Sequence, residues 1–270
     1  MIILQPEVIM ILKAIILGII EGLTEFLPIS STGHLIIANR FLDFEGPFAN
    51  TFAVVIQVGA IFAVVLYFRQ KLLPDFRNKE DFNRKMRLWS KVFTGVIPAV
   101  ILGVIFEEMI DKYLFNTTTV AFALISGAFL LLFFENRDHV VKVEDENELT
   151  YSQAFIVGIV QCLALIPGMS RSASTIIGGL GIGFGRKLAA EFSFFLAVPT
   201  LFGASFYKMA KGGLNINGGQ WGVLAVGTFV SFIVAYVVIA AFMNYIKKHS
   251  FNLFAYYRIV LGVLVLYIFK

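Results

Sequence analysis

Six stretches of this sequence are apolar over a length that can cross a lipid bilayer. They cover residues 51–68, 90–108, 117–134, 188–208, 221–243 and 252–269. A helix needs about 20 mostly apolar residues to span the hydrocarbon core. Charged residues make up 15% of the chain, against about 25% in a soluble domain, so the polar side chains needed to cover a water-facing surface are missing. We therefore expect an all-α polytopic membrane protein with six full transmembrane spans.

Two further apolar stretches, residues 8–42 and 152–184, are interrupted in the middle by residues that break helices. The first contains Pro28 followed by hydroxyl residues, and the second contains Pro167 and Gly168. Proline and glycine end helices, and non-helical backbone is tolerated at membrane depth only where protein or a wet cavity surrounds it. Each stretch is therefore predicted to form a re-entrant hairpin of two half-helices, which gives four half-helices in all.

The two interrupted stretches also resemble each other. A shift of 140 residues without gaps aligns several identical residues, Ser30 with Ser170 among them, and the similarity continues into the next span. We expect one membrane domain over residues 1–270, made of a first repeat over about 1–140 and a second over about 141–270. Each repeat then holds one hairpin and three spans. Because three is odd, the repeats are inverted, and such repeats place a site near the midplane where their broken helices meet.

The Lys and Arg residues are distributed unequally between the two faces of this topology. The face that includes the loop over residues 69–91 has fourteen, and the other face has five. The positive-inside rule places the first face in the cytoplasm, so we expect both termini and the mouth of the first hairpin to lie outside. Orientation and anionic lipid headgroups explain the basic loop, and no segment predicts binding to nucleic acid.

Glu21 and Glu25 lie four residues apart on the first half-helix and therefore on one face of it. A carboxylate in the hydrocarbon region costs at least a few kcal/mol. Two close carboxylates also repel each other, and a divalent cation with oxygen ligands would remove that repulsion. The pair predicts a metal-binding or acid–base site inside the membrane. The alternative is that both side chains are solvated near the interface.

Ser30, Ser31, Thr32 and His34 follow in the interruption itself. A hydroxyl beside an imidazole is the usual combination for nucleophilic catalysis, in which a base takes the hydroxyl proton as the oxygen attacks. Hydroxyl residues at a helix break also occur for capping alone, and a lone histidine is often a structural donor. Together with the two carboxylates, these residues favour the catalytic interpretation.

Arg171 occupies the corresponding interruption in the second half, where Ser170, Ser172 and Thr175 surround it. A guanidinium keeps its charge at any working pH, so at membrane depth it needs an anionic partner. An arginine, hydroxyl groups and a helix N-terminus together are typical of a phosphate site. The alternative is a structural salt bridge from this arginine to one of the two glutamates. A single site shared by both interruptions would hold a metal ion and a phosphate side by side.

Two segments carry a resemblance to a known family. Residues 21–34, Glu-Gly-Leu-Thr-Glu-Phe-Leu-Pro-Ile-Ser-Ser-Thr-Gly-His, and residues 167–175, Pro-Gly-Met-Ser-Arg-Ser-Ala-Ser-Thr, strongly resemble the two signature motifs of the bacterial undecaprenyl-diphosphate phosphatases. These are integral-membrane enzymes linked to bacitracin resistance. Length, hydropathy and motif spacing agree over essentially the whole chain. Ala173 stands where the second motif is expected to have glycine, which is a small-for-small change.

The resemblance implies removal of the terminal phosphate from undecaprenyl diphosphate, which yields the monophosphate carrier used in cell-wall synthesis. It implies a divalent cation, magnesium or calcium, and a site that opens to the outer face of the bacterial inner membrane. The implied substrate is a prenyl diphosphate lipid, and membrane lipids are expected around the protein. A homodimer is a further expectation.

By the same resemblance, Ser31 looks like the nucleophile and His34 like the base or an alternative nucleophile, a choice that the sequence leaves open. Glu21 and Glu25 look like the metal-binding or acid–base pair, and Arg171 looks like the phosphate clamp. The expected substrate-binding residues are Arg171, Ser170, Ser172, Thr175, Ser30 and Thr32.

The principal alternative function is a secondary transporter or lipid flippase that uses inverted repeats to alternate access. The glutamates and Arg171 would then bind ions and substrate, and no bond would be broken. Ser31 and His34 discriminate between the two functions, because a transporter has no need of an activated nucleophile. A membrane scaffold is a further alternative, but it leaves the charges at membrane depth unexplained.

Overall fold

The protein is described here from a computed structural model covering residues 6–138, 140–212, 216 and 218–269. All regular secondary structure in the described residues is helical, apart from one parallel β-bridge between Val143 and Phe184. Its helices are α1 (Pro6–Thr24), α2 (Ser31–Leu42), α3 (Pro47–Tyr67), α4 (Arg69–Leu72), α5 (Lys79–Tyr113), α6 (Thr117–Asn136), α7 (Tyr151–Gln161), the 3₁₀ helix η1 (Cys162–Leu165), α8 (Arg171–Gly181), α9 (Arg186–Gly212), α10 (Gly218–Tyr245) and α11 (Asn252–Ile268). The prediction of an all-α protein is confirmed.

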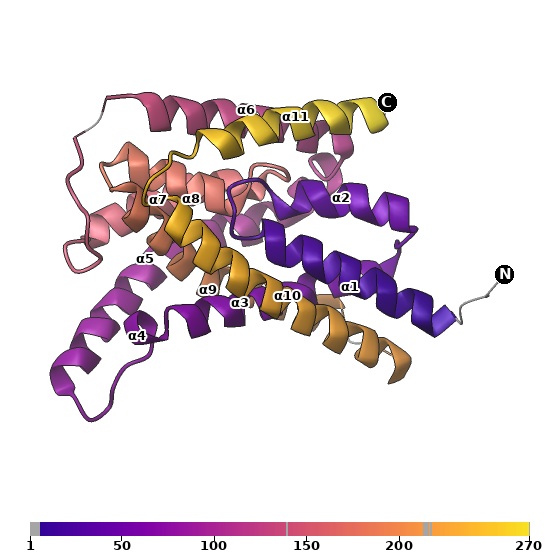
Figure 1. The fold of residues 1–270 in the computed structure, drawn as a ribbon, viewed down its shortest axis with the longest axis horizontal. Coiled ribbons are helices and arrows are strands. Elements are labelled where there is room, and N and C mark those ends of the chain that lie inside the picture. Colours follow the sequence, from indigo (N-terminus) through magenta and orange to yellow (C-terminus); the bar gives the residue numbers. More distant parts are fainter. Residues whose placement is uncertain (1–5, 139, 213–215, 217, 270) are drawn as a thin grey trace.

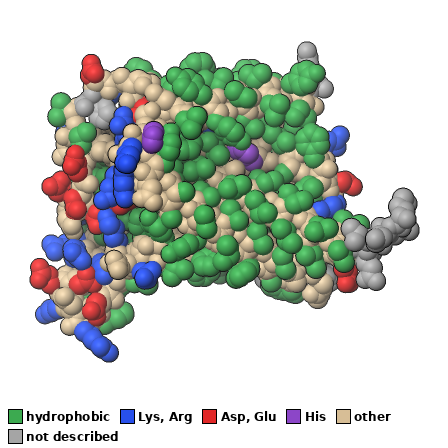
Figure 2. All heavy atoms as spheres, in the orientation of Figure 1, with side chains coloured by type: hydrophobic (Ala, Val, Ile, Leu, Met, Phe, Trp, Pro, Cys, Tyr) green, Lys and Arg blue, Asp and Glu red, His purple; other side chains and the backbone are tan. Residues whose placement is uncertain are grey.

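Within the described residues, five helices are long and apolar enough to cross a membrane, namely α3, α5, α6, α9 and α10. The sixth predicted span forms α11, whose 17 residues give a length of about 25 Å. Figure 2 shows a broad band of apolar side chains across the middle of the visible face, with charged side chains gathered toward its two ends. This distribution is that of a multi-pass membrane protein.

Each interrupted stretch folds into a helical hairpin. In the first, α1 and α2 are separated by residues 25–30 and pack against each other; in the second, α7 and η1 lead through residues 166–170 into α8, which packs back on α7. Figure 1 shows both hairpins between the α6–α11 pair and the long helices α3, α9 and α10.

The same backbone turn ends both interruptions. Ser30 has a φ of 71° and Ser170 a φ of 69°, the left-handed region that side chains other than glycine rarely adopt. Each serine caps the helix that follows, because its hydroxyl oxygen accepts a hydrogen bond from the backbone N–H of Gly33 or Ala173, respectively. The two half-helices α2 and α8 therefore begin in the same way, at positions 140 residues apart.

The amphipathicity of α1 is the reverse of that of a helix in water. Its apolar residues Ile16, Ile19 and Leu23 are exposed on the outside of the bundle, while the face with Gly22 is buried against α10. A Cβ atom at Gly22 would lie 2.8 Å from the carbonyl oxygen of Ser231, so only glycine permits this approach. Close packing of small residues is a main source of helix association in lipid, and here it positions the carboxylate of Glu21 in the interior.

Candidate active site

Glu25 joins the two hairpins. It lies just after the end of α1 and is 6% exposed. Its Oε2 accepts a hydrogen bond of 2.7 Å from the Ser31 hydroxyl, and its Oε1 forms an ion pair of 3.3 Å with Nη2 of Arg171. Because Arg171 begins α8 in the second half of the chain, this carboxylate connects a candidate nucleophile of one hairpin with the cation of the other. The structure thus brings these three predicted site residues together.

Arg171 is held in place from several sides. Its side chain is 8% exposed, its Nη1 donates a hydrogen bond of 2.9 Å to the Ser193 carbonyl on α9, and its guanidinium lies over the ring of Phe26. Thr175 contacts the same residue of α9, since its hydroxyl donates a hydrogen bond of 2.7 Å to the Ser193 hydroxyl. Nε of Arg171 is buried and has no hydrogen-bond partner among the described residues. A donor of this kind at a helix N-terminus is suited to an anion.

Glu21 is fully buried one helical turn before Glu25. Neither of its carboxylate oxygens accepts a hydrogen bond from a described residue, and it interacts electrostatically with Glu25 and Arg171. Buried charges in proteins are normally paired or bind a metal. The buried Glu21 carboxylate, next to that of Glu25, is therefore expected to bind a proton or a cation.

The donor set suits a hard divalent cation. Magnesium and calcium take oxygen ligands, and magnesium commonly uses one or two carboxylates together with substrate phosphate and water. Glu21 and Glu25 supply two carboxylates. No cluster of three or more His, Cys, Asp or Glu side chains occurs among the described residues, so a bound cation would need its remaining ligands from substrate and solvent.

The surroundings of His34 differ from the expected Ser–His pair. Its Nδ1 lies 2.7 Å from the Ser30 carbonyl oxygen, and its Nε2 lies 2.7 Å from the hydroxyl of Tyr257, whose ring stacks on the imidazole. A carbonyl oxygen can only accept, so Nδ1 carries the proton and Nε2 of the neutral ring accepts from Tyr257. The side chain in contact with the Ser31 hydroxyl is the carboxylate of Glu25 instead.

The predicted substrate-binding hydroxyls are largely engaged in holding the interruptions. Ser30 and Ser170 cap their helices. Ser172 lies 3.0 Å from the Ser170 hydroxyl and donates a hydrogen bond of 2.8 Å to the Leu27 carbonyl, which links the second interruption directly to the first. Thr32 is half-buried in the first turn of α2. These residues shape the wall of the site as the molecule stands.

Sequence reasoning missed two residues of α11. Tyr257 contacts His34 across the fold, and its neighbour Arg258 is fully buried. A signal for Arg258 was available, because it is a lone cation within the apolar stretch 252–269, and ionisable residues inside membrane segments are usually functional. Nothing local in the sequence pointed to Tyr257.

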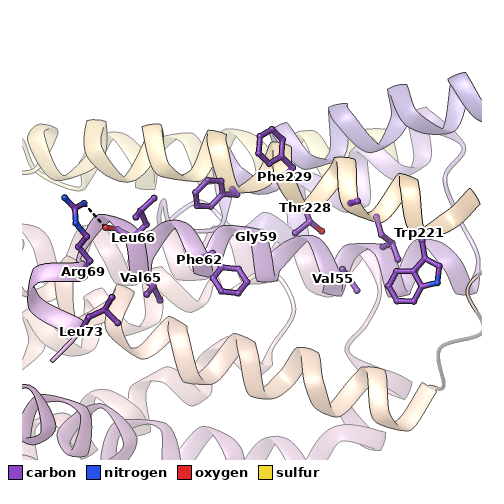
Figure 3. Close-up of a pocket in the computed structure, with 13 residues that line it drawn as sticks. Val55, Gly59, Phe62, Val65, Leu66, Arg69, Leu73, Trp221, Thr228 and Phe229 are labelled. Carbon is purple, nitrogen blue, oxygen red and sulfur yellow. Dashed lines mark hydrogen bonds between the residues drawn. The ribbon is translucent and has the colours of Figure 1, made fainter. Parts of the chain in front are cut away.

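A separate groove lies on the outer surface between α3 and α10 and has a volume of about 760 Å³. Figure 3 shows Arg69 at one end of it and Trp221 at the other, with apolar side chains such as Phe62 and Phe229 between them. Among the described residues that line this groove, none carries a carboxylate, and Thr228 is the one with a hydroxyl. The groove suits an apolar chain, whereas the groups able to do chemistry lie in the buried cluster between the hairpins.

Comparison with known proteins gives a family. The sequence profile described as "Bacitracin resistance protein BacA" matches residues 14–264. Undecaprenyl-diphosphatase 1 of Clostridioides difficile is 50% identical over 260 residues, which cover 95% of this chain and 95% of the relative. The undecaprenyl-diphosphatases of Fusobacterium nucleatum and Pseudomonas savastanoi pv. phaseolicola are 46% and 48% identical, over 93% and 94% of this chain and 98% and 92% of the relatives. The chain therefore belongs to the bacitracin resistance protein BacA family.

Proposed function

We propose that this protein hydrolyses undecaprenyl diphosphate to undecaprenyl phosphate and inorganic phosphate at a site between its two hairpins. The relatives that carry the name undecaprenyl-diphosphatase match nearly the whole chain, which supports the reaction. The observation that carries the site is the arrangement of Glu25, with Ser31 on one carboxylate oxygen and Arg171 on the other. A nucleophile, its base and a phosphate-binding cation are then in contact before substrate arrives.

In the proposed mechanism, Ser31 attacks the terminal phosphorus while Glu25 accepts its hydroxyl proton. The bond from that phosphorus to the bridging oxygen breaks, and undecaprenyl phosphate leaves with the electron pair. Water then attacks the phosphoserine, the bond from phosphorus to Ser31 breaks, and Glu25 returns a proton to the serine oxygen. Arg171 binds the phosphoryl oxygens and stabilises their charge throughout. When Arg171 binds the substrate, its ion pair with Glu25 is broken. The Glu25 carboxylate is then free to act as a base.

Glu21 and Glu25 would hold a divalent cation, magnesium or calcium. When bound, the cation neutralises charge on the substrate diphosphate. The unpartnered oxygens of Glu21 support this assignment. Without a bound cation, burying these two oxygens with no hydrogen-bond donor is unfavourable.

We infer that both hairpins are re-entrant and belong to two inverted repeats of a single membrane domain. The second helices of the hairpins, α2 and α8, have 12 and 11 residues, or about 18 and 17 Å, which is too short to cross a hydrocarbon core of about 30 Å. The matching turns at Ser30 and Ser170 support the repeat. With the basic 69–91 loop in the cytoplasm, the site opens to the outer face of the bacterial inner membrane. The chain ends, residues 1–5 and 270, are not among the described residues, and their location on the outer face stays a prediction.

The remaining partners follow from this function. A diphosphate site between buried hairpins, in a chain with an apolar outer band, suits a lipid whose tail stays in the bilayer while its headgroup enters the protein. Homodimer formation stays a prediction.

The test is release of inorganic phosphate from a prenyl diphosphate by the purified protein in detergent, with and without a chelator. We expect release that depends on a divalent cation and is lost in Ser31→Ala, Glu25→Gln and Arg171→Ala. Ser90→Ala is the matched control, because Ser90 lies at the charged end of α5 and bonds Tyr151. Full turnover in Ser31→Ala would remove this serine as nucleophile. Absence of release by the intact protein would contradict the function and favour transport.

A further inference from the structure

Arg258 is a buried cation that the proposed chemistry does not use. It lies on α11 and has no exposed surface. Within the described part of the chain it forms no ion pair. Instead its guanidinium donates hydrogen bonds to five backbone carbonyls, those of Ala123, Leu124, Pro28, Gly168 and Met169. A charge inside a membrane protein is costly and usually marks a functional residue, and an apolar side chain would fill the same space without that cost.

Three of the carbonyls bound by Arg258 belong to the interruptions, and both interruptions are represented. Nη1 donates to Pro28 at 3.4 Å in the first, and Nη2 donates to Gly168 at 3.3 Å and Met169 at 2.9 Å in the second. Pro28 and Gly168 are 140 residues apart, so they are equivalent positions of the two halves. One planar guanidinium therefore spans matching points of the two hairpins.

These carbonyls lie immediately before the strained turns. Pro28 precedes Ser30 by two residues, as Gly168 precedes Ser170, and both serines have a positive φ. A non-glycine residue persists in that conformation only when the surrounding structure holds it. Ser31 and Arg171, the groups that the proposed reaction depends on, come directly after these turns.

The neighbouring helix leaves space for the guanidinium. Gly127 on α6 faces it, and a Cβ atom at that position would collide with Nη2 of Arg258. Two further hydrogen bonds, to Ala123 and Leu124, attach the same side chain to α6. Arg258 is thus anchored on a helix outside the hairpins while it holds both of them.

We infer that Arg258 is a positioning residue that sets the separation of the two interruptions and so holds Ser31 and Glu25 in line with Arg171. The guanidinium is a rigid fork with five donors, so the spacing of its nitrogens fixes the spacing of the carbonyls. A lysine keeps the charge but has a single nitrogen, which cannot bridge both interruptions in this way. The consequence for catalysis rests on the function proposed above; the structural consequence does not.

Loss of alignment predicts a specific kinetic defect. A displacement of about 1 Å at reacting groups costs on the order of 100-fold in rate, whereas substrate binding through its lipid tail is unaffected. We expect kcat of Arg258→Lys to fall roughly 10- to 100-fold with KM within about threefold of the wild type. Arg186→Lys is the matched control, because Arg186 pairs with Glu135 away from the interruptions, and it should retain wild-type kcat.

A second readout does not depend on activity. Amide hydrogen exchange, followed by mass spectrometry of the full-length protein in detergent, should speed up in residues 25–34 and 166–175 together in Arg258→Lys. The control Arg186→Lys should leave both segments unchanged. Gly127→Ala, which displaces the guanidinium while the arginine remains, should produce the same exchange pattern as Arg258→Lys.

The outcomes separate the two proposals. Faster exchange in both interruptions, with reduced kcat and unchanged KM, supports the positioning role. Faster exchange in both segments of a protein that releases no phosphate supports the role and contradicts the proposed function. A folded Arg258→Lys variant with wild-type kcat overturns the inference, as does a general loss of protection that does not single out the two interruptions.

Discussion

Glu21→Gln is predicted to make the protein more stable and less active. Glu21 is a fully buried carboxylate with two unpartnered oxygens, and a charge at this depth costs about 2.5–3.5 kcal/mol. The fold already accepts glutamine at the equivalent position of the second half, where Gln161 is likewise buried with both polar atoms unpartnered. Replacement removes the charge at nearly constant volume.

The expected gain in the free energy of unfolding is the cost of the buried charge minus the cost of burying the glutamine amide. A buried amide without partners keeps a penalty of about 1 kcal/mol, so a net gain of about 2 kcal/mol remains, or an increase in Tm on the order of 5 °C. Thermal unfolding in detergent with a chelator, followed by tryptophan fluorescence, measures it. Added magnesium at 100 times its Kd should increase the free energy of unfolding of the wild type by about 2.7 kcal/mol. The Tm of the wild type should rise accordingly, whereas that of Glu21→Gln should not. Phosphate release by the variant should fall at least 100-fold.

Gln161, at the equivalent position of the second half, provides the matched control. Gln161→Glu places a second unpaired carboxylate at the equivalent buried position and should lower the Tm by a similar amount. If Glu21→Gln lowers the Tm in the presence of chelator, its carboxylate has a partner that stabilises its charge. If magnesium stabilises both forms equally, the cation binds elsewhere.

Three further predictions concern the surroundings of the site. Ser172→Ala removes the hydrogen bond that links the interruptions and should lower stability by about 1–2 kcal/mol, seen as a fall in Tm; an unchanged Tm would contradict the link. Tyr257→Phe keeps the ring but removes the donor to His34, so kcat should fall about fivefold, whereas a wild-type kcat would exclude a role for this hydroxyl. In the 138–149 loop, hydrogen bonds from the backbone and side chain of Asn147 lower the pKa of Asp145. Its stabilising effect is therefore present above the unfolded pKa and lost as pH falls through the lowered folded pKa; the Tm difference between wild type and Asp145→Asn should vanish over that range, and a constant difference would contradict the assignment.

The sequence predicted the features that depend on solvation and local backbone chemistry. Apolar runs of membrane length are unfavourable in water and therefore lie in the bilayer. They form helices because every backbone N–H and C=O group within the bilayer must form a hydrogen bond inside the protein. Pro28 and Pro167 mark the interruptions for an equally local reason. The charges of Glu25 and Arg171 were recognisable as a site because ionisable groups within apolar stretches need partners, and in the structure they are partners of each other.

Only the tertiary structure decided which groups meet over long distances in the chain. His34 lies three residues from Ser31 in sequence, yet its ring contacts Tyr257, 223 residues away, and Ser31 bonds Glu25 instead. The hydrogen bonds of Arg258 to both interruptions depend on how α11 packs on α6. Helical periodicity determines which face a side chain occupies, but the packing of several helices determines what that face meets, and no local pattern in a single sequence encodes that packing.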